Sequence, residues 1–270
     1  MGKAASARPI SRSTSTMSDP ETVEVVAERV ARASRVAVLT GAGVSAESGM
    51  ATFREPQHGL WSKYDPMELA HIDAFRRDPE LVSRWYHWRF SQAAECAPNP
   101  GHRALADLER VLTGRGCDFV LATQNIDGLH QQAGSERVLE LHGTFLTWRC
   151  TETAERVPLD RVDFSSFPVR SASGSLMRPD VVWFGEQLPA DVLRRAEEAV
   201  RSCDVFMTVG TSGVVWPAAG FCELAASAGA ATVEINPEET PVSGAAQFAI
   251  RGTSARVLPM LLERIVSMDS

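Results

Sequence analysis

Short apolar runs rich in β-branched residues, each ending in a small polar loop, limit this chain to few architectures. The runs are RVAVLT (35–40), DFVLAT (118–123), DVFMTVG (204–210) and ATVEIN (231–236). Segments with helical apolar spacing precede or separate them, at 21–34, 102–112, 190–202 and 216–228. Apolar strands alternating with helices are typical of parallel sheets built from βαβ units. The sequence therefore predicts an α/β fold with a doubly wound, Rossmann-like parallel sheet.

Two stretches interrupt this alternation and predict a smaller domain made of two insertions. Residues 55–100 are aromatic and largely helical, and residues 149–176 are irregular. The Rossmann-like domain then comprises 21–54, 101–148 and 177–268. Residues 1–20 are rich in Ser, Ala and Arg without an apolar signal-peptide core, so we expect a disordered tail; an organellar transit peptide is the alternative.

Charge, hydropathy and cysteine usage exclude several classes of protein. The net charge of −7 disfavours nucleic-acid binding, which needs a basic surface. No apolar run approaches the roughly 18 residues of a membrane span. The five cysteines are an odd number scattered without a framework, which indicates a reducing, cytoplasmic location.

The polar loops after the strands carry the candidate binding residues. GAGVSA (41–46) fits the G-x-G-x-x-G/A fingerprint, whose glycines let the backbone approach a pyrophosphate at a helix N-terminus. QNIDGLH (124–130), GTS (210–212) and NPE (236–238) follow the other strands. The acidic ribose ligand expected about 20 residues after the fingerprint has no clear candidate, and Asn236 could replace it. Four such loops favour a large polar ligand such as NAD, although Asn125 and Asp127 could instead stabilise a local turn.

His142, within ELHG (140–143), is a candidate general base because imidazole titrates near neutral pH. A histidine with satisfied hydrogen bonds in the core is the alternative, and the spacing does not decide between them.

Six segments together resemble the sirtuins, a family of NAD-dependent protein lysine deacylases. They occur in family order: GAGVSAESGMATFR (41–54), TQNIDGLHQQAG (123–134), LELHG (139–143), RPDVVWFGE (178–186), VGTSGVVWPA (209–218) and EINPEET (234–240). The resemblance spans nearly all of the chain after residue 20. It implies nicotinamide release from NAD, which is consumed as a co-substrate, and transfer of the acyl group to ADP-ribose.

The resemblance also implies a role for each matched position. His142 would be the base, and Asn125 and Asp127 would act in catalysis, Asp127 by holding the nicotinamide carboxamide. Val182, Trp183, Phe184 and Gly185 would pair with the extended acyl-lysine peptide as an added β-strand. The implied NAD contacts are Gly41, Ala42, Gly43, Ser45, Phe53, Arg54, Gln124, Asn125, Ile126, Asp127, Gly210, Thr211, Ser212, Asn236 and Ser254.

A helix predicted from Pro79 to Cys96 suggests which acyl group is removed. Two adjacent apolar stripes on this helix predict that it is buried, so a charged residue such as Arg89 is unusual there. The Arg89 guanidinium could reach water or a structural carboxylate, or it could bind an anion together with Tyr86. The Tyr-x-x-Arg pair and Ala70 resemble the sirtuin class that removes succinyl and malonyl groups. A guanidinium binds a carboxylate bidentately, so we expect succinyl and malonyl to be preferred over acetyl.

The chain departs from the family at its zinc module. Most sirtuins hold one structural zinc through two cysteine pairs, but here only Cys150 remains, and 169–176 contains no cysteine. We therefore expect no structural zinc, with a substitute apolar core made by Val157, Leu159, Val162, Phe164, Phe167 and Val169. Two other functions stay open: a catalytically silent NAD-sensing protein, and an NAD glycohydrolase or ADP-ribosyltransferase.

Overall fold

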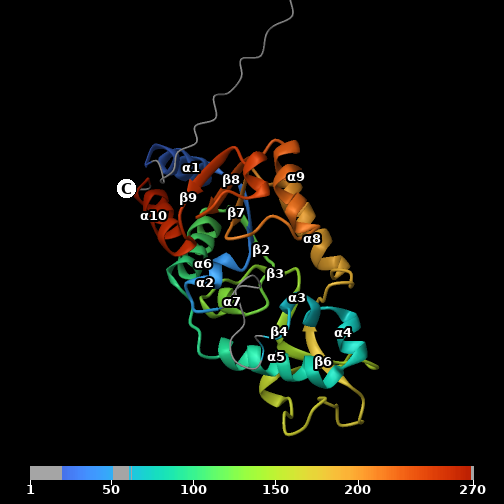
Figure 1. The fold of residues 1–270 in the computed structure, drawn as a ribbon. Helices are drawn as coiled ribbons and strands as arrows, with labels where there is room; N and C mark the ends of the chain where they lie inside the picture. The colour runs from blue at the N-terminus through green and yellow to red at the C-terminus, as the bar shows by residue number, and fades with distance from the viewer. Residues whose placement is uncertain (1–19, 51–60, 62, 269–270) are drawn as a thin grey trace, which may run out of the picture.

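The main sheet is parallel throughout and confirms the predicted doubly wound fold (Figure 1). The computed structural model describes residues 20–50, 61 and 63–268. The strand order is β3-β2-β1-β7-β8-β9. The strands are β1 (Arg35–Thr40), β2 (Asp118–Thr123), β3 (Val138–Glu140), β7 (Val205–Val209), β8 (Ala231–Asn236) and β9 (Phe248–Arg251). The four runs identified in the sequence form the four central strands, and β3 and β9 are added at the edges.

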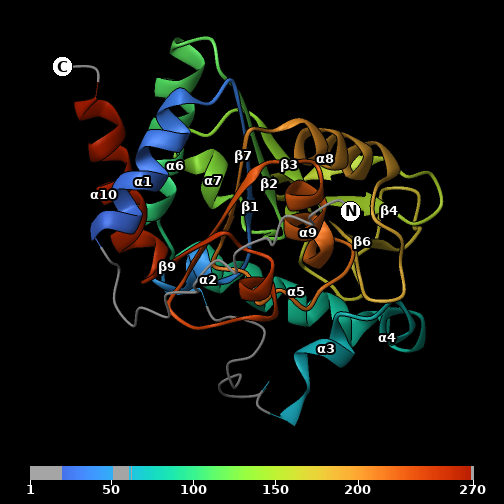
Figure 2. The ribbon, with the colours of Figure 1, turned by 90° about the horizontal axis from the view of Figure 1, so that it is seen from above.

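Helices cover both faces of this sheet, as Figure 2 shows from above. One face carries α1 (Pro20–Arg32), α6 (Pro100–Gly114) and α10 (Ser254–Ser267), and the other carries α8 (Ala190–Ser202) and α9 (Phe221–Ser227). Alternate residues of β1 point to opposite faces, so that Val36 and Val38 pack in the first core while Ala37 and Leu39 pack in the second. Both faces are buried, which explains why the strands are apolar throughout.

The smaller part of the molecule combines a three-stranded antiparallel sheet with helices. Its strands, in the order β5-β4-β6, are β4 (Gly143–Cys150), β5 (Arg156–Pro158) and β6 (Met177–Val181). Its helices are α3 (Pro66–Leu69), α4 (Ile72–Arg77) and α5 (Pro79–Ala93). Short elements complete the described chain: α2 (Gly43–Ala46), α7 (Leu129–Gln132), η2 (Leu159–Arg161), η3 (Ala218–Gly220) and η4 (Pro241–Gly244).

The small sheet includes residues that the sequence division assigned to the Rossmann-like domain. Residues 143–148 of β4 and 177–181 of β6 pair with each other, outside the parallel sheet. Their register shifts between Thr144 and Trp148, and this irregularity breaks the two-residue alternation that marks a half-buried strand.

The substitute core expected around 157–169 packs against the aromatic cluster of the small part. Val169 is fully buried there, and Val157, Leu159, Val162, Phe164 and Phe167 are partly buried against the same cluster. The Phe164 ring lies 5.3 Å from that of Trp148 and 4.6 Å from that of His87. Within the described residues, no helix combines the length and apolar composition needed to cross a membrane.

Candidate active site

The loops that follow β1, β2, β7 and β8 meet at one edge of the main sheet. Because these strands are parallel, their carboxyl ends lie side by side. Hydrogen bonds join the loops: the Gly43 N–H donates to the Gly210 carbonyl (2.8 Å), and the Thr211 hydroxyl donates to Gln124 Oε1 (2.9 Å). The Asn236 amide donates to the Thr211 carbonyl (2.8 Å). The sequence thus correctly identified four loops that meet.

The glycine loop after β1 packs directly against the loop after β7. A Cβ on Gly43 would lie 2.7 Å from the Gly210 carbonyl oxygen, and Gly210 has a φ of +59°, which disfavours other residues. The helix that follows, α2, has only four residues. The long helix of a typical dinucleotide fold is therefore absent at this loop, and close backbone approach is the feature that the glycines provide.

Ser45, buried on α2, is the centre of a hydrogen-bond network behind this edge. Its hydroxyl donates to Asp127 Oδ2 (2.8 Å) and accepts from the Asn125 amide (3.1 Å). His102 Nε2 lies 3.3 Å from the same oxygen. His102 Nδ1 accepts from the Asn99 N–H, so the neutral ring carries its proton on Nε2 and donates it to Ser45. Ser45 therefore fixes both candidate catalytic residues of the second loop.

Burial changes the acid–base behaviour of Asp127. Burial raises the pKa of its carboxyl, while the Leu129 N–H, the Ser45 hydroxyl and the charge of Arg89 oppose the rise. The charge of Asp127 in turn opposes the lowering of the Arg89 pKa. The two charged groups, one in each candidate pocket, therefore influence each other's pKa.

A pair of buried histidines, His102 and His130, supports this network, and sequence reasoning did not assign a role to either. Their ring centroids are 4.9 Å apart, and His130 Nε2 lies 2.9 Å from the Thr40 hydroxyl. Burial lowers the pKa of His102 to about 4 and that of His130 to about 3. The signal in the sequence was Asn99-Pro100-Gly101-His102, which forms a capping box at the start of α6.

The candidate base His142 lies between β3 and β4. Its Nδ1 lies 2.9 Å from the Gln124 carbonyl oxygen. A carbonyl only accepts, so Nδ1 carries the proton and Nε2 keeps the basic lone pair. Burial lowers the pKa of His142, against the effect of this hydrogen bond, so the ring is neutral at pH 7. His142 thus makes the hydrogen bond expected of a core histidine through Nδ1, and it keeps the lone pair that a base needs on Nε2.

Ser254 is the candidate contact for the adenosine part of NAD. It begins α10 and is buried against α6, where a Cβ on Gly101 would lie 2.9 Å from its carbonyl carbon. Its hydroxyl has no hydrogen-bond partner among the described residues. Ser212 and Ile126 are half-buried on the loops described above. Phe53 and Arg54, which the resemblance assigns to the reacting ribose, lie outside the described residues.

The acyl-pocket candidates come together in the small part. Ala70, Tyr86 and Arg89 are 4%, 2% and 8% exposed, so the Arg89 side chain is not on the surface. The Trp183 indole donates to the Tyr86 hydroxyl (2.8 Å). Burial lowers the pKa of Arg89, and Tyr86 and Asp127 oppose this shift. The helix predicted over 79–96 is observed as α5, which ends at Ala93.

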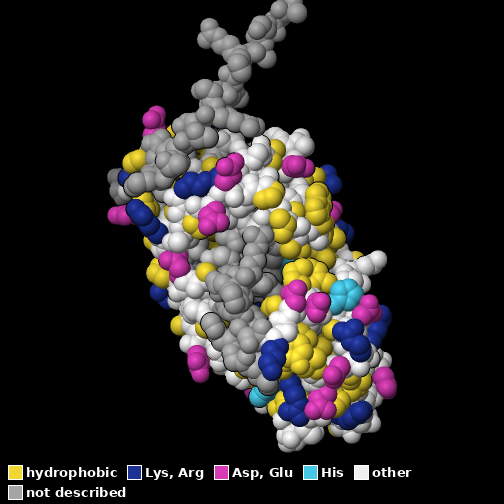
Figure 3. Space-filling model, viewed as in Figure 1, with side chains coloured by type: hydrophobic (Ala, Val, Ile, Leu, Met, Phe, Trp, Pro, Cys, Tyr) yellow, Lys and Arg dark blue, Asp and Glu magenta, His cyan; other side chains and the backbone are white. Residues whose placement is uncertain are grey.

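The segment 182–185 is less open than an added-strand site requires. The Val182 N–H donates to the His142 carbonyl, the Phe184 N–H donates to the Ala70 carbonyl (2.8 Å), and the Phe184 carbonyl accepts from the Ile72 N–H (3.1 Å). Trp183 is 1% exposed, in the core instead of at an edge. A peptide would therefore need backbone groups of this segment other than those of Phe184. Figure 3 shows apolar side chains at the surface of the face that it draws. Phe184, Val214 and Trp216 are among the exposed large apolar residues of the described chain.

Comparison with known proteins agrees with this geometry. A model of the Sir2 family matches residues 41–217. The chain is 46% identical over 239 residues to a protein named NAD-dependent protein deacylase from Mycolicibacterium paratuberculosis, covering 87% of this chain and 99% of that one. This protein belongs to the Sir2 family.

Two solved structures resemble the fold closely. A Sir2 homologue in complex with NAD superposes with a TM-score of 0.85 at 42% identity, covering 92% of this chain and 95% of that chain. A mutant Sir2 homologue in complex with 2′-O-acetyl ADP ribose gives a TM-score of 0.84 at 42% identity, covering 92% and 98%.

Proposed function

We propose that this protein is an NAD-dependent protein-lysine deacylase. The observation that carries the proposal is that the loop of Asn125 and Asp127 is hydrogen-bonded both to Ser45, beside the glycine loop, and to His142. The relatives support it: one is named a protein deacylase, and another was solved with acetylated ADP-ribose, the kind of product left when nicotinamide departs from NAD and the acyl group is transferred to the ADP-ribosyl part.

The residues at this edge fit NAD. Gly43 and Gly210 let the loops after β1 and β7 pack backbone against backbone, and this glycine-lined loop would hold the pyrophosphate. The buried Ser254 hydroxyl, without a partner among the described residues, suits a polar group of the adenosine moiety. Thr211 and Asn236, which are hydrogen-bonded to each other, would contact the phosphates and the adenosine ribose. NAD would supply an ADP-ribosyl group that accepts the acyl group once nicotinamide leaves.

Asp127, Asn125 and His142 would have different roles in the reaction. Asp127, fixed by Ser45, would hold the carboxamide of nicotinamide, and Asn125 would orient the adjacent ribose. His142, protonated on Nδ1, would accept a ribose hydroxyl proton on Nε2. Burial of the pocket would exclude water from the reacting carbon.

One assay separates deacylation from the two other functions. Purified protein is incubated with NAD and with acetyl-, succinyl- or malonyl-lysine peptides. The amounts of nicotinamide and of deacylated peptide are then measured. Nicotinamide release that depends on peptide supports the deacylase. Equal release without peptide would identify an NAD glycohydrolase, and NAD binding without any release would identify a sensor.

The proposed acyl preference is for succinyl and malonyl over acetyl. Tyr86 and Arg89 are one helical turn apart, buried, and both donors. A hydrogen bond to a charged group contributes about 1.5–3 kcal/mol, which corresponds to a preference of roughly 10- to 100-fold. Arg89→Met should therefore lower the succinyl-to-acetyl ratio of kcat/KM by that factor and leave residual deacetylation.

Arg84→Met is the matched control for this variant. Arg84 lies on the same helix but is exposed and paired with Glu80. Its removal should leave the ratio unchanged. Wild-type protein that removes acetyl at least as efficiently as succinyl would contradict the proposal, as would an unchanged ratio in Arg89→Met.

The small part is proposed to fold without zinc. Hydroxyl contacts occupy the region of the missing cysteines: Ser171 and Ser173 lie 2.9 Å apart, and Ser175 donates to Glu152 (2.8 Å). No group of three or more metal-ligating side chains was found in the described part of the chain. Elemental analysis of purified protein should find well under one zinc per chain, and a stoichiometric zinc content would refute the proposal.

A further inference from the structure

A single hydrogen bond determines how the Tyr86 hydroxyl can be used. The Trp183 Nε1–H donates to the Tyr86 oxygen at 2.8 Å, and both side chains are at least 98% buried. An indole N–H can only donate, so the phenol oxygen must accept in this contact. The proton of the Tyr86 hydroxyl is therefore directed toward a different acceptor.

The Tyr86 hydroxyl also keeps its proton at every physiological pH. Burial raises its pKa to about 12, although Arg89 and the bond from Trp183 oppose the rise. Arg89, three residues further along α5, carries donors only. Both side chains are buried on one side of α5 and both carry donors, and a carboxylate is the partner that matches two donors. The methyl group of an acetyl offers them no acceptor.

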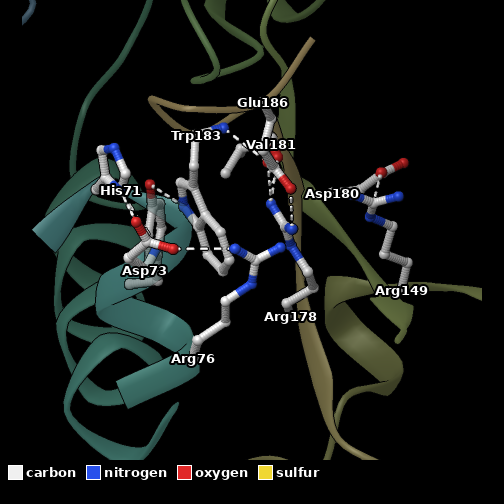
Figure 4. Close-up of polar contacts among 10 residues, drawn as sticks. His71, Asp73, Arg76, Arg149, Arg178, Asp180, Val181, Trp183 and Glu186 are labelled. Carbon is white, nitrogen blue, oxygen red and sulfur yellow. Dashed lines mark hydrogen bonds and ion pairs between the residues drawn. The ribbon is translucent and has the colours of Figure 1, made fainter. Parts of the chain in front are cut away.

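Arg178 stacks on the indole ring of Trp183, and Glu186 links Arg178 to the Trp183 backbone. The Arg178 guanidinium lies 3.4 Å from the centre of the Trp183 ring system and makes a bidentate ion pair with Glu186 (2.5 and 2.7 Å). Glu186 also accepts from the Trp183 backbone N–H (2.9 Å). Figure 4 shows these three side chains together with the Arg178 contact to Val181. A ring stacked and clamped in this way keeps its N–H aimed in one direction.

We propose that Trp183 is a positioning residue for acyl specificity: by donating to Tyr86, it fixes the hydroxyl as a donor and so favours acyl groups that end in a carboxylate. The inference rests on the proposed succinyl and malonyl preference. Trp183 would act through Tyr86 and would not itself contact the carboxylate of the acyl group.

The test is Trp183→Phe, which keeps an aromatic ring but removes the donor. The succinyl-to-acetyl ratio of kcat/KM should fall by about threefold to tenfold, because that is the contribution of one neutral hydrogen bond. The control is Trp85→Phe. The Trp85 Nε1 is buried without a partner among the described residues, and phenylalanine keeps an aromatic face near Arg89. That variant should keep the wild-type ratio.

A double variant shows whether Trp183 acts through Tyr86. In a Tyr86→Phe background, Trp183→Phe should lower the ratio no further. If Trp183→Phe does not fold by circular dichroism, Arg178→Lys tests the same clamp, since lysine keeps the charge but loses the planar stack, and it should lower the ratio in the same direction.

The outcomes distinguish the inference from the function on which it rests. An unchanged ratio in Trp183→Phe, or in Arg178→Lys where that variant is needed, would overturn the inference if Arg89→Met still lowers the ratio. An equal loss on succinyl and acetyl substrates, or an equal fall in Trp85→Phe, would overturn it in favour of a purely structural role. No change in either Arg89→Met or Tyr86→Phe would instead refute the proposed acyl preference.

Discussion

The buried pair His102 and His130 should make the protein sensitive to mild acid. Both side chains are at most 1% exposed. Burial lowers their pKa values to about 4 and about 3, with smaller contributions from Arg103 to the first and from His102 to the second. An unfolded histidine, with a pKa near 6.5, takes up a proton as the pH falls, whereas the folded side chains do not. Stability is therefore present above about pH 6.5 and is lost as the pH falls below it.

The size of the effect follows from proton linkage. Each buried histidine costs about 1.4 kcal/mol per pH unit below 6.5, so the step from pH 7 to pH 5 costs about 2 kcal/mol for each and about 4 kcal/mol for the pair. Carboxyls with raised pKa values, such as those of Asp127 and Glu140, act in the opposite direction. The difference between two variants isolates one histidine from these other groups.

The assay is urea unfolding of the wild type and of His130→Asn at pH 7 and pH 5. Far-UV circular dichroism is the suitable signal, because most tryptophans lie in the small part and would report on it alone. His130→Asn should be less stable than the wild type at pH 7, yet lose about 2 kcal/mol less between the two pH values. Equal losses in the two proteins would refute the reasoning.

Three further predictions concern the candidate active site. His142→Ala should lower deacylation by about 10²- to 10⁴-fold with an unchanged circular dichroism spectrum, and more than about a third of wild-type turnover would exclude it as the base. Asn125→Ala or Asp127→Ala should slow nicotinamide release strongly while changing the melting temperature little. Nicotinamide release at the wild-type rate would argue against the assignment of these residues to the nicotinamide pocket. Gly43→Ala, whose Cβ would lie 2.7 Å from Gly210, should weaken NAD binding by calorimetry, and wild-type affinity would contradict close packing there.

The parallel sheet was predictable because its signals are local. Each central strand is a continuous apolar run, and β1, β2 and β8 have the predicted limits. The edge strands β3 and β9 have three and four residues, too short for a pattern to stand out. The small antiparallel sheet depends on pairing between segments about 30 residues apart, with a register shift that no local pattern reveals.

The positions of the candidate site residues were predictable from sequence where these residues follow strands of the parallel sheet. Polar loops after parallel strands must meet, so Gln124, Thr211 and Asn236 could be placed together from sequence. His102 could not, because it reaches Ser45 from a helix 57 residues away in sequence. The pairing of Phe184 with the helical insertion was likewise hidden, since it joins two irregular segments.

The proposed acyl preference follows more from a mismatch with acetyl than from attraction to succinyl. Tyr86 and Arg89 are buried donors, and the hydroxyl oxygen already accepts a hydrogen bond from Trp183. An acyl group without an acceptor would cover these donors without hydrogen bonding to them, and sites built around polar groups reject such ligands strongly. The charge of Asp127 near Arg89 limits the penalty, because it partly stabilises the guanidinium when no acyl carboxylate is present. Deacetylation should therefore be slow but measurable in the wild type, and a variant that lacks the donors should change the preference without losing the chemistry of the NAD site.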